Sequence, residues 1–235
     1  FTLAESRKME NKTQVKSKQR VADHGEVFTA EREVNAMLDL VKQETENISS
    51  RFLEPACGDG NFLAEILSRK LTVVKRKYRR QAHDYEKNAI LALSSIYGVD
   101  ILLDNAIACR ERLFAIWDKE YKAVCREECR DDTREAATFI LSRNIVCGNT
   151  LTLVCVDENG NDTADPIVFS EWAFITGTQM QRKDYTFDEL LKAADQTAKI
   201  ARTGQMSLLA NEDGEIEPTF LKQYISDYRR VQDNG

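Results

Sequence analysis

The chain has 235 residues, of which 42% are hydrophobic and 31% are charged, and its formal net charge is −6. A chain of this length can bury a substantial core, so a fibrous or wholly disordered protein is excluded. No stretch approaches the roughly 20 apolar residues of a membrane-spanning helix, and residues 1–12 lack the apolar core of a signal peptide. We therefore expect a cytoplasmic protein with no membrane contact, whose acidic surface as a whole does not suit nucleic acid.

The first 150 residues predict alternating helices and strands. Residues 1–20 are polar and basic and predict a flexible arm, and residues 31–41 have the apolar spacing of an amphipathic helix. The predicted strands are 51–55, 97–101 and 144–149; the predicted helices begin at Phe62 and cover 89–96, 104–121 (capped by Asp104) and 133–141. This alternation indicates an α/β domain with a largely parallel sheet, because parallel strands need crossover connections.

Beyond residue 151 the pattern is less regular. A turn is predicted over 157–162, a strand over 166–172, and helices over 187–201 and 217–231.

The six cysteines do not indicate a disulfide framework, which is typical of short secreted proteins. Cys125 and Cys129 form a lone C-x3-C pair, with no second cysteine or histidine pair at ligand spacing. We expect free thiols and no metal site, with these two cysteines one turn apart on a helix.

A basic run covers residues 69–80 and contains Arg69, Lys70, Lys75, Arg76, Lys77, Arg79 and Arg80. A solvated helix face explains such a run, and a phosphate-contacting surface stays open as the alternative. The residues of that nucleic-acid-binding alternative are Lys75, Arg76, Lys77, Arg79 and Arg80.

The strongest candidate for a binding site is the segment 52–62, which reads Phe-Leu-Glu-Pro-Ala-Cys-Gly-Asp-Gly-Asn-Phe. Glycines after a buried strand let the backbone turn sharply and pass close to a ligand. Asp59 places a carboxylate beside the free N–H groups of the following helix, where it would repel a phosphate. S-adenosylmethionine carries a sulfonium and an amino group, so it fits this segment better than NAD or ATP.

This segment resembles motif I of the amino-methyltransferases that modify adenine in DNA, in the class of type I modification subunits and related restriction-modification methylases. The resemblance implies a Rossmann-like S-adenosylmethionine-dependent methyltransferase fold, with a mainly parallel sheet flanked by helices. It also implies that the cofactor is held by motif residues, namely Glu54, Pro55, Ala56, Gly58, Asp59 and Gly60.

An upstream segment and a downstream acid are similar to further motifs of that family. The stretch 25–30 resembles the motif that closes over the methionine end of the cofactor, which implies contacts by Phe28 and Thr29. Taken alone, Thr29 would be no more than a helix N-cap. Asp100, followed by Ile101, is similar to the acid that receives the cofactor's ribose hydroxyls.

The spacing of that acid departs from the dinucleotide-binding pattern. Asp100 stands 42 positions after Gly58, against about 20 in that fold. An inserted helical, basic segment over about 70–93 explains the excess. Asn149 completes the set, since it is similar to the third-motif residue that meets the adenine exocyclic amine.

The family's catalytic signature, N/D/S-P-P-Y/F, is not found. The nearest segment, 165–169, reads Asp-Pro-Ile-Val-Phe, so Asp165 and Pro166 are weak catalytic candidates, and a structural strand is the alternative. The resemblance covers about residues 20–175 and implies three parts: a basic arm (1–20), a methyltransferase-like cofactor-binding domain (21–205) and a C-terminal helical extension (206–235).

The implied activity is transfer of a methyl group from S-adenosylmethionine to N6 of adenine in DNA, by this chain or by a larger system of which it is a fragment or subunit. DNA and a specificity or completing subunit are the implied partners. Two alternatives remain. One is a non-catalytic cofactor- or partner-binding protein that has lost the catalytic signature, and the other is a methyltransferase that acts on RNA, protein or a small molecule.

Overall fold

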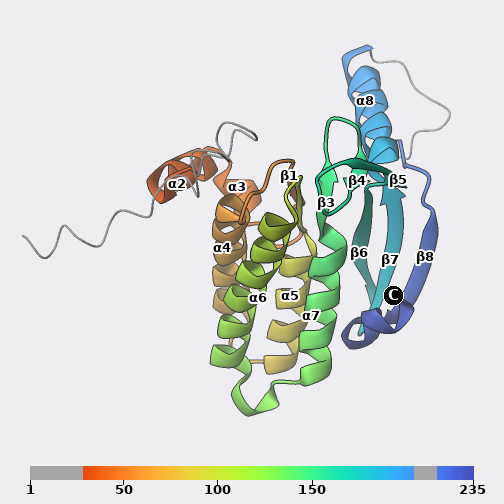
Figure 1. Ribbon diagram of the computed structural model, residues 1–235. Helices are drawn as coiled ribbons and strands as arrows, with labels where there is room; N and C mark the ends of the chain where they lie inside the picture. The colour runs from red at the N-terminus through yellow and green to blue at the C-terminus, as the bar shows by residue number, and fades with distance from the viewer. Residues whose placement is uncertain (1–28, 204–215) are drawn as a thin grey trace, which may run out of the picture.

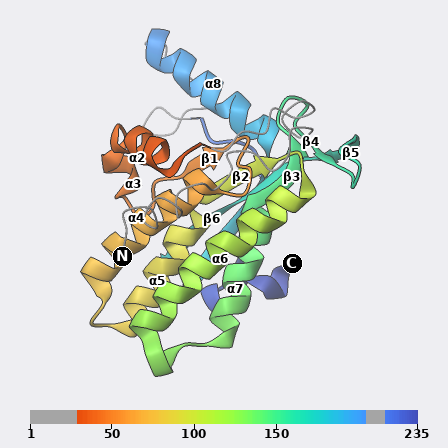
Figure 2. The same cartoon turned by 60° about the vertical axis from the view of Figure 1, so that its left-hand side comes forward.

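The computed structural model describes residues 29–203 and 216–235, which form two β-sheets beside a layer of helices (Figures 1 and 2). The first sheet has the order β1 (Phe52–Glu54), β2 (Ile96–Asp100), β3 (Ile145–Asn149), β4 (Val154–Val156), β5 (Asp162–Pro166). The second has the order β6 (Val168–Thr176), β7 (Gln179–Thr186), β8 (Lys222–Asp227). Residues 1–28, which include the predicted arm and Phe28, and residues 204–215 lie outside this description.

The helices connect these strands. They are α2 (Glu31–Asp39), α3 (Lys42–Thr45), α4 (Asn61–Tyr78), α5 (Ala82–Ser94), α6 (Leu103–Cys125), the 3-10 turn η1 (Arg126–Glu128), α7 (Asp131–Asn144), α8 (Phe187–Thr203) and the 3-10 helix η2 (Tyr228–Asn234). The long connection predicted between the glycine turn and Asp100 is the end of α4 together with α5, and it is helical as expected.

The first sheet is mixed. Strands β1, β2 and β3 are parallel, and each crossover between them passes through two of the helices α4–α7. Strands β4 and β5 are antiparallel to their neighbours, and β6–β8 form a purely antiparallel sheet that was not expected. The predicted α/β class is confirmed, but parallel pairing is confined to the first three strands.

The two faces of the first sheet belong to different cores because side chains alternate along a strand. On one face Ile96 and Ile145 pack under helices α4–α7 in the main core. On the other face Tyr97 and Val99 pack against a smaller cluster that includes Phe169 of β6. The helix layer and the second sheet therefore hold the parallel strands between them.

The predicted C-terminal helix over 217–231 is wrong. Residues 222–227 form β8 and pair with β7 over six positions, with Ile225 opposite Gln181. The backbone bonds of this ladder outweigh the helical spacing of the apolar residues, and only the short 3-10 helix η2 follows. The predicted strand over 166–172 is likewise two elements, because β5 ends at Pro166 and β6 begins at Val168.

Three local predictions also need correction. The N-cap residue of α6 is Leu102, so Asp104 lies in the first turn of that helix and does not cap it. The N-cap residue of α2 is Ala30 and not Thr29. Cys125 ends α6 while Cys129 follows η1, so the two cysteines do not share a helix. The chain reverses between them, which local spacing alone does not reveal.

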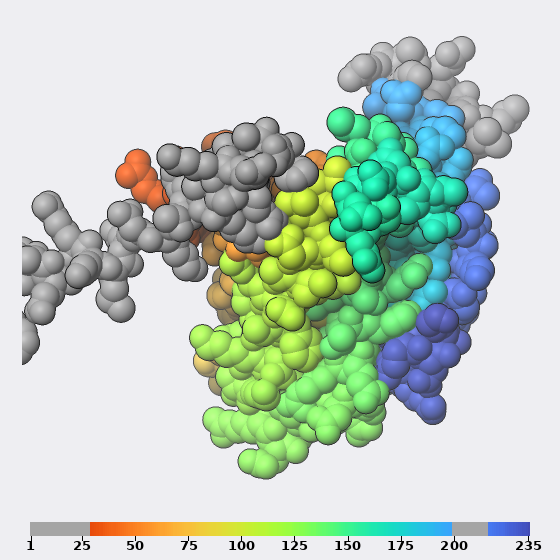
Figure 3. All heavy atoms as spheres, in the orientation of Figure 1, coloured from red at the N-terminus to blue at the C-terminus, as the bar shows by residue number. Residues whose placement is uncertain are grey.

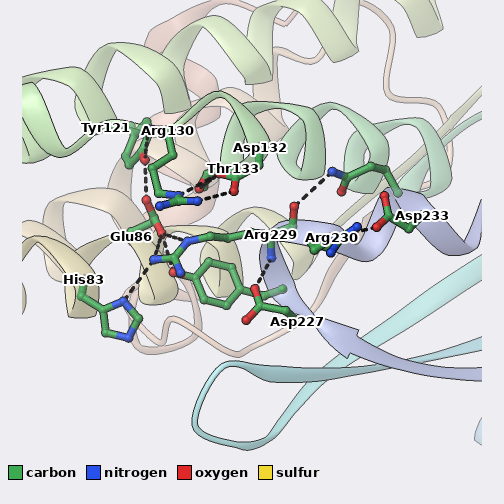
Figure 4. Close-up of polar contacts among 12 residues, drawn as sticks. His83, Glu86, Tyr121, Arg130, Asp132, Thr133, Asp227, Arg229, Arg230 and Asp233 are labelled. Atoms are coloured by element: carbon green, nitrogen blue, oxygen red, sulfur yellow. Dashed lines mark hydrogen bonds and ion pairs between the residues drawn. The ribbon is translucent and has the colours of Figure 1, made fainter.

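A buried carboxylate, Glu86, fastens the C-terminal segment to the helices (Figure 4). Its oxygens accept hydrogen bonds from the hydroxyls of Tyr121 and Tyr228 and from Arg229 Nε at 2.7 Å. Burial and the bond to Glu86 raise the pKa of both tyrosines. Arg229 also contacts His83 Nδ1 at 3.2 Å, so the C-terminus is tied to α5 by polar contacts as well as by apolar packing.

A buried lysine supports the segment that leads into β1. Lys70, in the basic run, is fully buried instead of exposed, and its ammonium donates to the carbonyls of Ile48 and Ser50 and to Ser95 Oγ. Burial lowers the pKa of Lys70 to about 7. Its side chain therefore positions the segment before β1 and is not available to an external anion.

Lys70 makes the stability of the protein dependent on pH. In the unfolded chain a lysine titrates at about pH 10.4, so between pH 7 and 10 the unfolded state binds more protons than the folded state. The free energy of unfolding should therefore rise with pH in this window, by up to about 1.4 kcal/mol per pH unit. In Lys70→Met this contribution is absent. Urea unfolding of both proteins at pH 6, 7, 8 and 9 measures it, and parallel pH profiles would contradict it.

Candidate functional site

The carboxyl ends of the three parallel strands meet at one edge of the first sheet. Glu54 ends β1, Asp100 ends β2 and Asn149 ends β3, and the parallel pairing brings these ends together. Crevices outside the carboxyl ends of parallel strands are the usual ligand sites of α/β sheets. The structure thus gathers most of the predicted cofactor residues at one place.

The glycine turn is built by two residues with positive φ. Gly58 has φ +54° and Gly60 has φ +87°, a conformation that favours glycine. A Cβ on Gly60 would also lie 2.7 Å from Cys109 Sγ. Gly60 is the cap position of α4 and has no side chain to bond the first-turn N–H groups, so these donors face the carboxyl edge.

Asp100 fastens this turn to β2. Its Oδ2 accepts the Gly58 N–H at 2.9 Å, and its Oδ1 accepts the Leu102 N–H at 2.9 Å and the Asn105 amide at 3.2 Å. A carboxylate offers about four acceptor positions, so these bonds leave Asp100 room for about one more. Asp100 is 9% exposed, so it is largely buried at the carboxyl edge of the sheet.

Asp59, the central acid of the turn, has a partner within the chain. Arg112 donates to Asp59 Oδ2 at 2.7 Å and Oδ1 at 3.3 Å, and to Asn61 Oδ1 at 2.5 Å. The sequence predicts that the cation facing Asp59 belongs to a ligand, but in the structure it is the guanidinium of Arg112, on α6. A bound cation is therefore not needed to neutralise Asp59.

Around the turn, the carboxyl edge of the sheet nevertheless has more carboxylates than cations. Glu54, Asp59 and Asp100 stand around the turn, and Arg112 neutralises one of them. Burial raises the pKa of Glu54, although the N–H of Ala56 acts in the opposite direction. Arg110 points to β3, where its Nε donates to the Ile145 carbonyl at 2.9 Å. These charges oppose a polyphosphate at the turn.

Sequence reasoning missed that one face of α6 supports the turn. Asn105, Cys109 and Arg112 stand at i, i+4 and i+7 and reach Asp100, Cys57 and Asp59, respectively. The Cys57 thiol contacts Cys109 and is buried, and both effects raise its pKa. This helical spacing of non-aliphatic residues directly after Asp100 is the signal that could have revealed the supporting face.

Asn149 is engaged in its own turn. Its Oδ1 accepts the Leu151 N–H at 3.0 Å, and its Nδ2 donates to Asp162 Oδ1 at 3.0 Å. The weak catalytic candidates Asp165 and Pro166 lie exposed on the antiparallel strand β5. Strand β5 is four positions from β1 in the sheet, a distance of about 19 Å at 4.8 Å per strand. Asp165 and Pro166 therefore do not reach the glycine turn after β1.

The remaining predicted contacts lie beside the turn. Pro55 and Ala56 are exposed on its outer side, and Ile101 is half-buried directly after β2. The Ile101 carbonyl faces Cys147 Sγ at 3.7 Å, which links the ends of β2 and β3. Thr29 is half-buried just before α2.

The predicted nucleic-acid residues lie away from the turn. Arg69 pairs with Asp39 at 2.9 Å and Lys75 with Glu120 at 2.8 Å. Four cations are exposed in or just after the last turn of α4 and make no ion pair with another described residue: Arg76, Lys77, Arg79 and Arg80. The 18 residues of α4 span about 27 Å at 1.5 Å per residue. The turn and the basic residues therefore occupy opposite ends of one helix.

Two cavities lie outside the carboxyl edge. One of about 170 Å³ is on the sheet face opposite the helices and is lined by Phe52, Tyr97, Phe169 and Tyr185 among others, with the ion-paired Arg51 and Glu171. The other lies at the far end of α4. In the described residues no group of three or more His, Cys, Asp or Glu side chains is placed to hold a metal ion.

Comparisons of the chain with protein-family models, with curated proteins and with solved structures find no match. Within the described residues, no helix has both the length and the apolar character needed to cross a membrane.

Proposed function

We propose that this chain binds S-adenosylmethionine at the carboxyl edge of β1–β3, in a Rossmann-like methyltransferase fold. We further propose that it acts in a restriction-modification type system, as a domain or subunit that methylates N6 of adenine in DNA. One observation carries the proposal: the turn of Gly58 and Gly60 is bonded to the acid that ends the next parallel strand, Asp100, at 2.9 Å. This joins a close-approach backbone to a hydroxyl acceptor in one site.

The residues at the edge fit such a ligand. The remaining acceptor position of Asp100 suits a ribose hydroxyl, and the uncapped N–H groups of α4 suit the methionine carboxylate. The excess of carboxylates favours a ligand with a sulfonium and an amino group over NAD or ATP. S-adenosylmethionine supplies an activated methyl group, and the protein's part is to align it with the acceptor amine.

The proposal gives Asp165 and Pro166 no catalytic role because they lie four strand positions from β1. It therefore includes a completing or specificity subunit that contributes the missing motif. The same observation favours the second candidate, a non-catalytic protein that keeps the cofactor site and binds a partner.

Two measurements test these candidates. Calorimetry should detect binding of S-adenosylmethionine and no binding of ATP or NAD at the same concentrations. Incubation with plasmid DNA and methyl-labelled cofactor, with and without candidate subunits, should then incorporate label. Tight cofactor binding without incorporation would favour the non-catalytic candidate, and absence of cofactor binding to the folded protein would remove both.

A further inference from the structure

A charged cavity of about 550 Å³ lies at the end of α4 that is remote from the glycine turn. Its lining comes from α4 and from the corner between α6 and η1, which is at the bottom of the molecule in Figures 1 and 3. The charged lining residues are Lys75, Arg79, Arg126, Glu127 and Glu128. Helix α4 and the 3-10 turn η1 thus place three cations, Lys75, Arg79 and Arg126, around one cavity.

Further cations extend this surface. Arg76, Lys77 and Arg80 continue around the end of α4, and all three are exposed. With Lys75, Arg79 and Arg126 they make six cations, whereas the cavity lining contains two carboxylates, Glu127 and Glu128. Lys75 is paired with Glu120. The positive excess is local, in a chain whose net charge is −6.

The backbone of one lining residue, Arg126, is strained. Arg126 has φ +51° and ψ −116°, the conformation of the first central residue of a type II′ turn, where glycine is the usual residue. Strained non-glycine residues cluster at functional sites, where the surrounding structure maintains the strain. Packing does not explain Arg126, since its side chain is exposed.

We propose that this cavity and the neighbouring arginines bind successive phosphates of a nucleic-acid backbone. Six cations spread over two helices exceed what a single phosphate can contact, whereas a polymer with regularly repeated charge can engage them together. The identification of that polymer as the methylation substrate rests on the proposed function. The contact lies about 27 Å from the glycine turn, so a duplex that touches both spans about eight base pairs.

Fluorescence anisotropy with a labelled duplex well over that length tests the proposal between about 50 and 200 mM salt. Arg76→Glu/Arg80→Glu should weaken binding at least tenfold at the lower salt concentration. It should also reduce the slope of log K against log salt by about 2, one unit for each lost phosphate contact. The matched control is Lys222→Glu/Arg230→Glu, the same charge change at exposed residues of β8 and η2. Equal weakening by both variants, or by neither, would overturn the proposal.

Arg126→Gly separates a binding role from a structural one. Glycine accepts the positive φ, so the melting temperature should be unchanged or higher, while affinity for the duplex falls several-fold. An unchanged affinity would show that Arg126 takes no part in binding the duplex. Binding of anionic phospholipid vesicles but not of the duplex would overturn the choice of partner. Calorimetry with S-adenosylmethionine distinguishes the two proposals, because absence of cofactor binding by the unaltered protein counts against the proposed function alone.

Discussion

Asp100→Ala is expected to lower the affinity for S-adenosylmethionine at least 100-fold, equivalent to about 3 kcal/mol. The substitution removes the acceptor of three hydrogen bonds, including the one from the Gly58 N–H that closes the glycine turn. Each donor left unpaired in a buried place costs about 1–3 kcal/mol, so the turn would give up the conformation that the ligand needs. It also removes the acceptor position assigned to the ribose hydroxyl. Isothermal calorimetry measures the effect.

The matched control for Asp100 is Asp157→Ala. Asp157 also accepts backbone N–H bonds, from Asn159 at 2.8 Å and Asn161 at 2.9 Å, but in the exposed turn between β4 and β5. Its replacement should leave cofactor affinity unchanged. If Asp100→Ala does not fold, Asp100→Asn serves instead, because its amide places a donor where one of the carboxylate oxygens accepted. Full affinity in a folded Asp100 variant would contradict the proposed cofactor site.

Glu86→Gln is expected to lower the free energy of unfolding by about 3 kcal/mol or more, as removal of one member of a buried ion pair usually does. The carboxylate is 3% exposed and bonds Tyr121, Tyr228 and Arg229 together. An amide has one acceptor oxygen instead of two and no charge, so the guanidinium and one hydroxyl would be left without an adequate partner. Urea unfolding followed by circular dichroism measures the loss.

Glu65→Gln is the control for the carboxylate at position 86. Glu65 pairs with Arg69 at 2.9 Å on the partly exposed face of α4, so its loss should cost less than about 1 kcal/mol. Tyr228→Phe provides a smaller change within the cluster, because it removes only one hydroxyl. Equal stability losses for Glu65→Gln and Glu86→Gln would show that the Glu86 cluster has no special weight in holding the C-terminal segment.

The first half of the fold could be predicted from the sequence because its signals are local. Apolar runs closed by Pro55 or by Gly148 indicate buried strands, and apolar residues at helical spacing indicate α2, α4 and α6. Glycine tolerates positive φ, so Gly58 and Gly60 predict a sharp turn, which the structure has. The long helical connections between these strands favour a parallel sheet, whereas the order β1-β2-β3 comes from the structure.

Only the tertiary structure decided which side chains far apart in the chain become partners. Asp59 lies beside Arg112, 53 positions away, and Lys70 is buried under carbonyls of residues 48 and 50. The strand β8 exists because β7 offers it a ladder, although its own sequence favours a helix. Local spacing encodes which face of an element is apolar, but the charge, burial and pairing of a side chain depend on what the folded chain places opposite it.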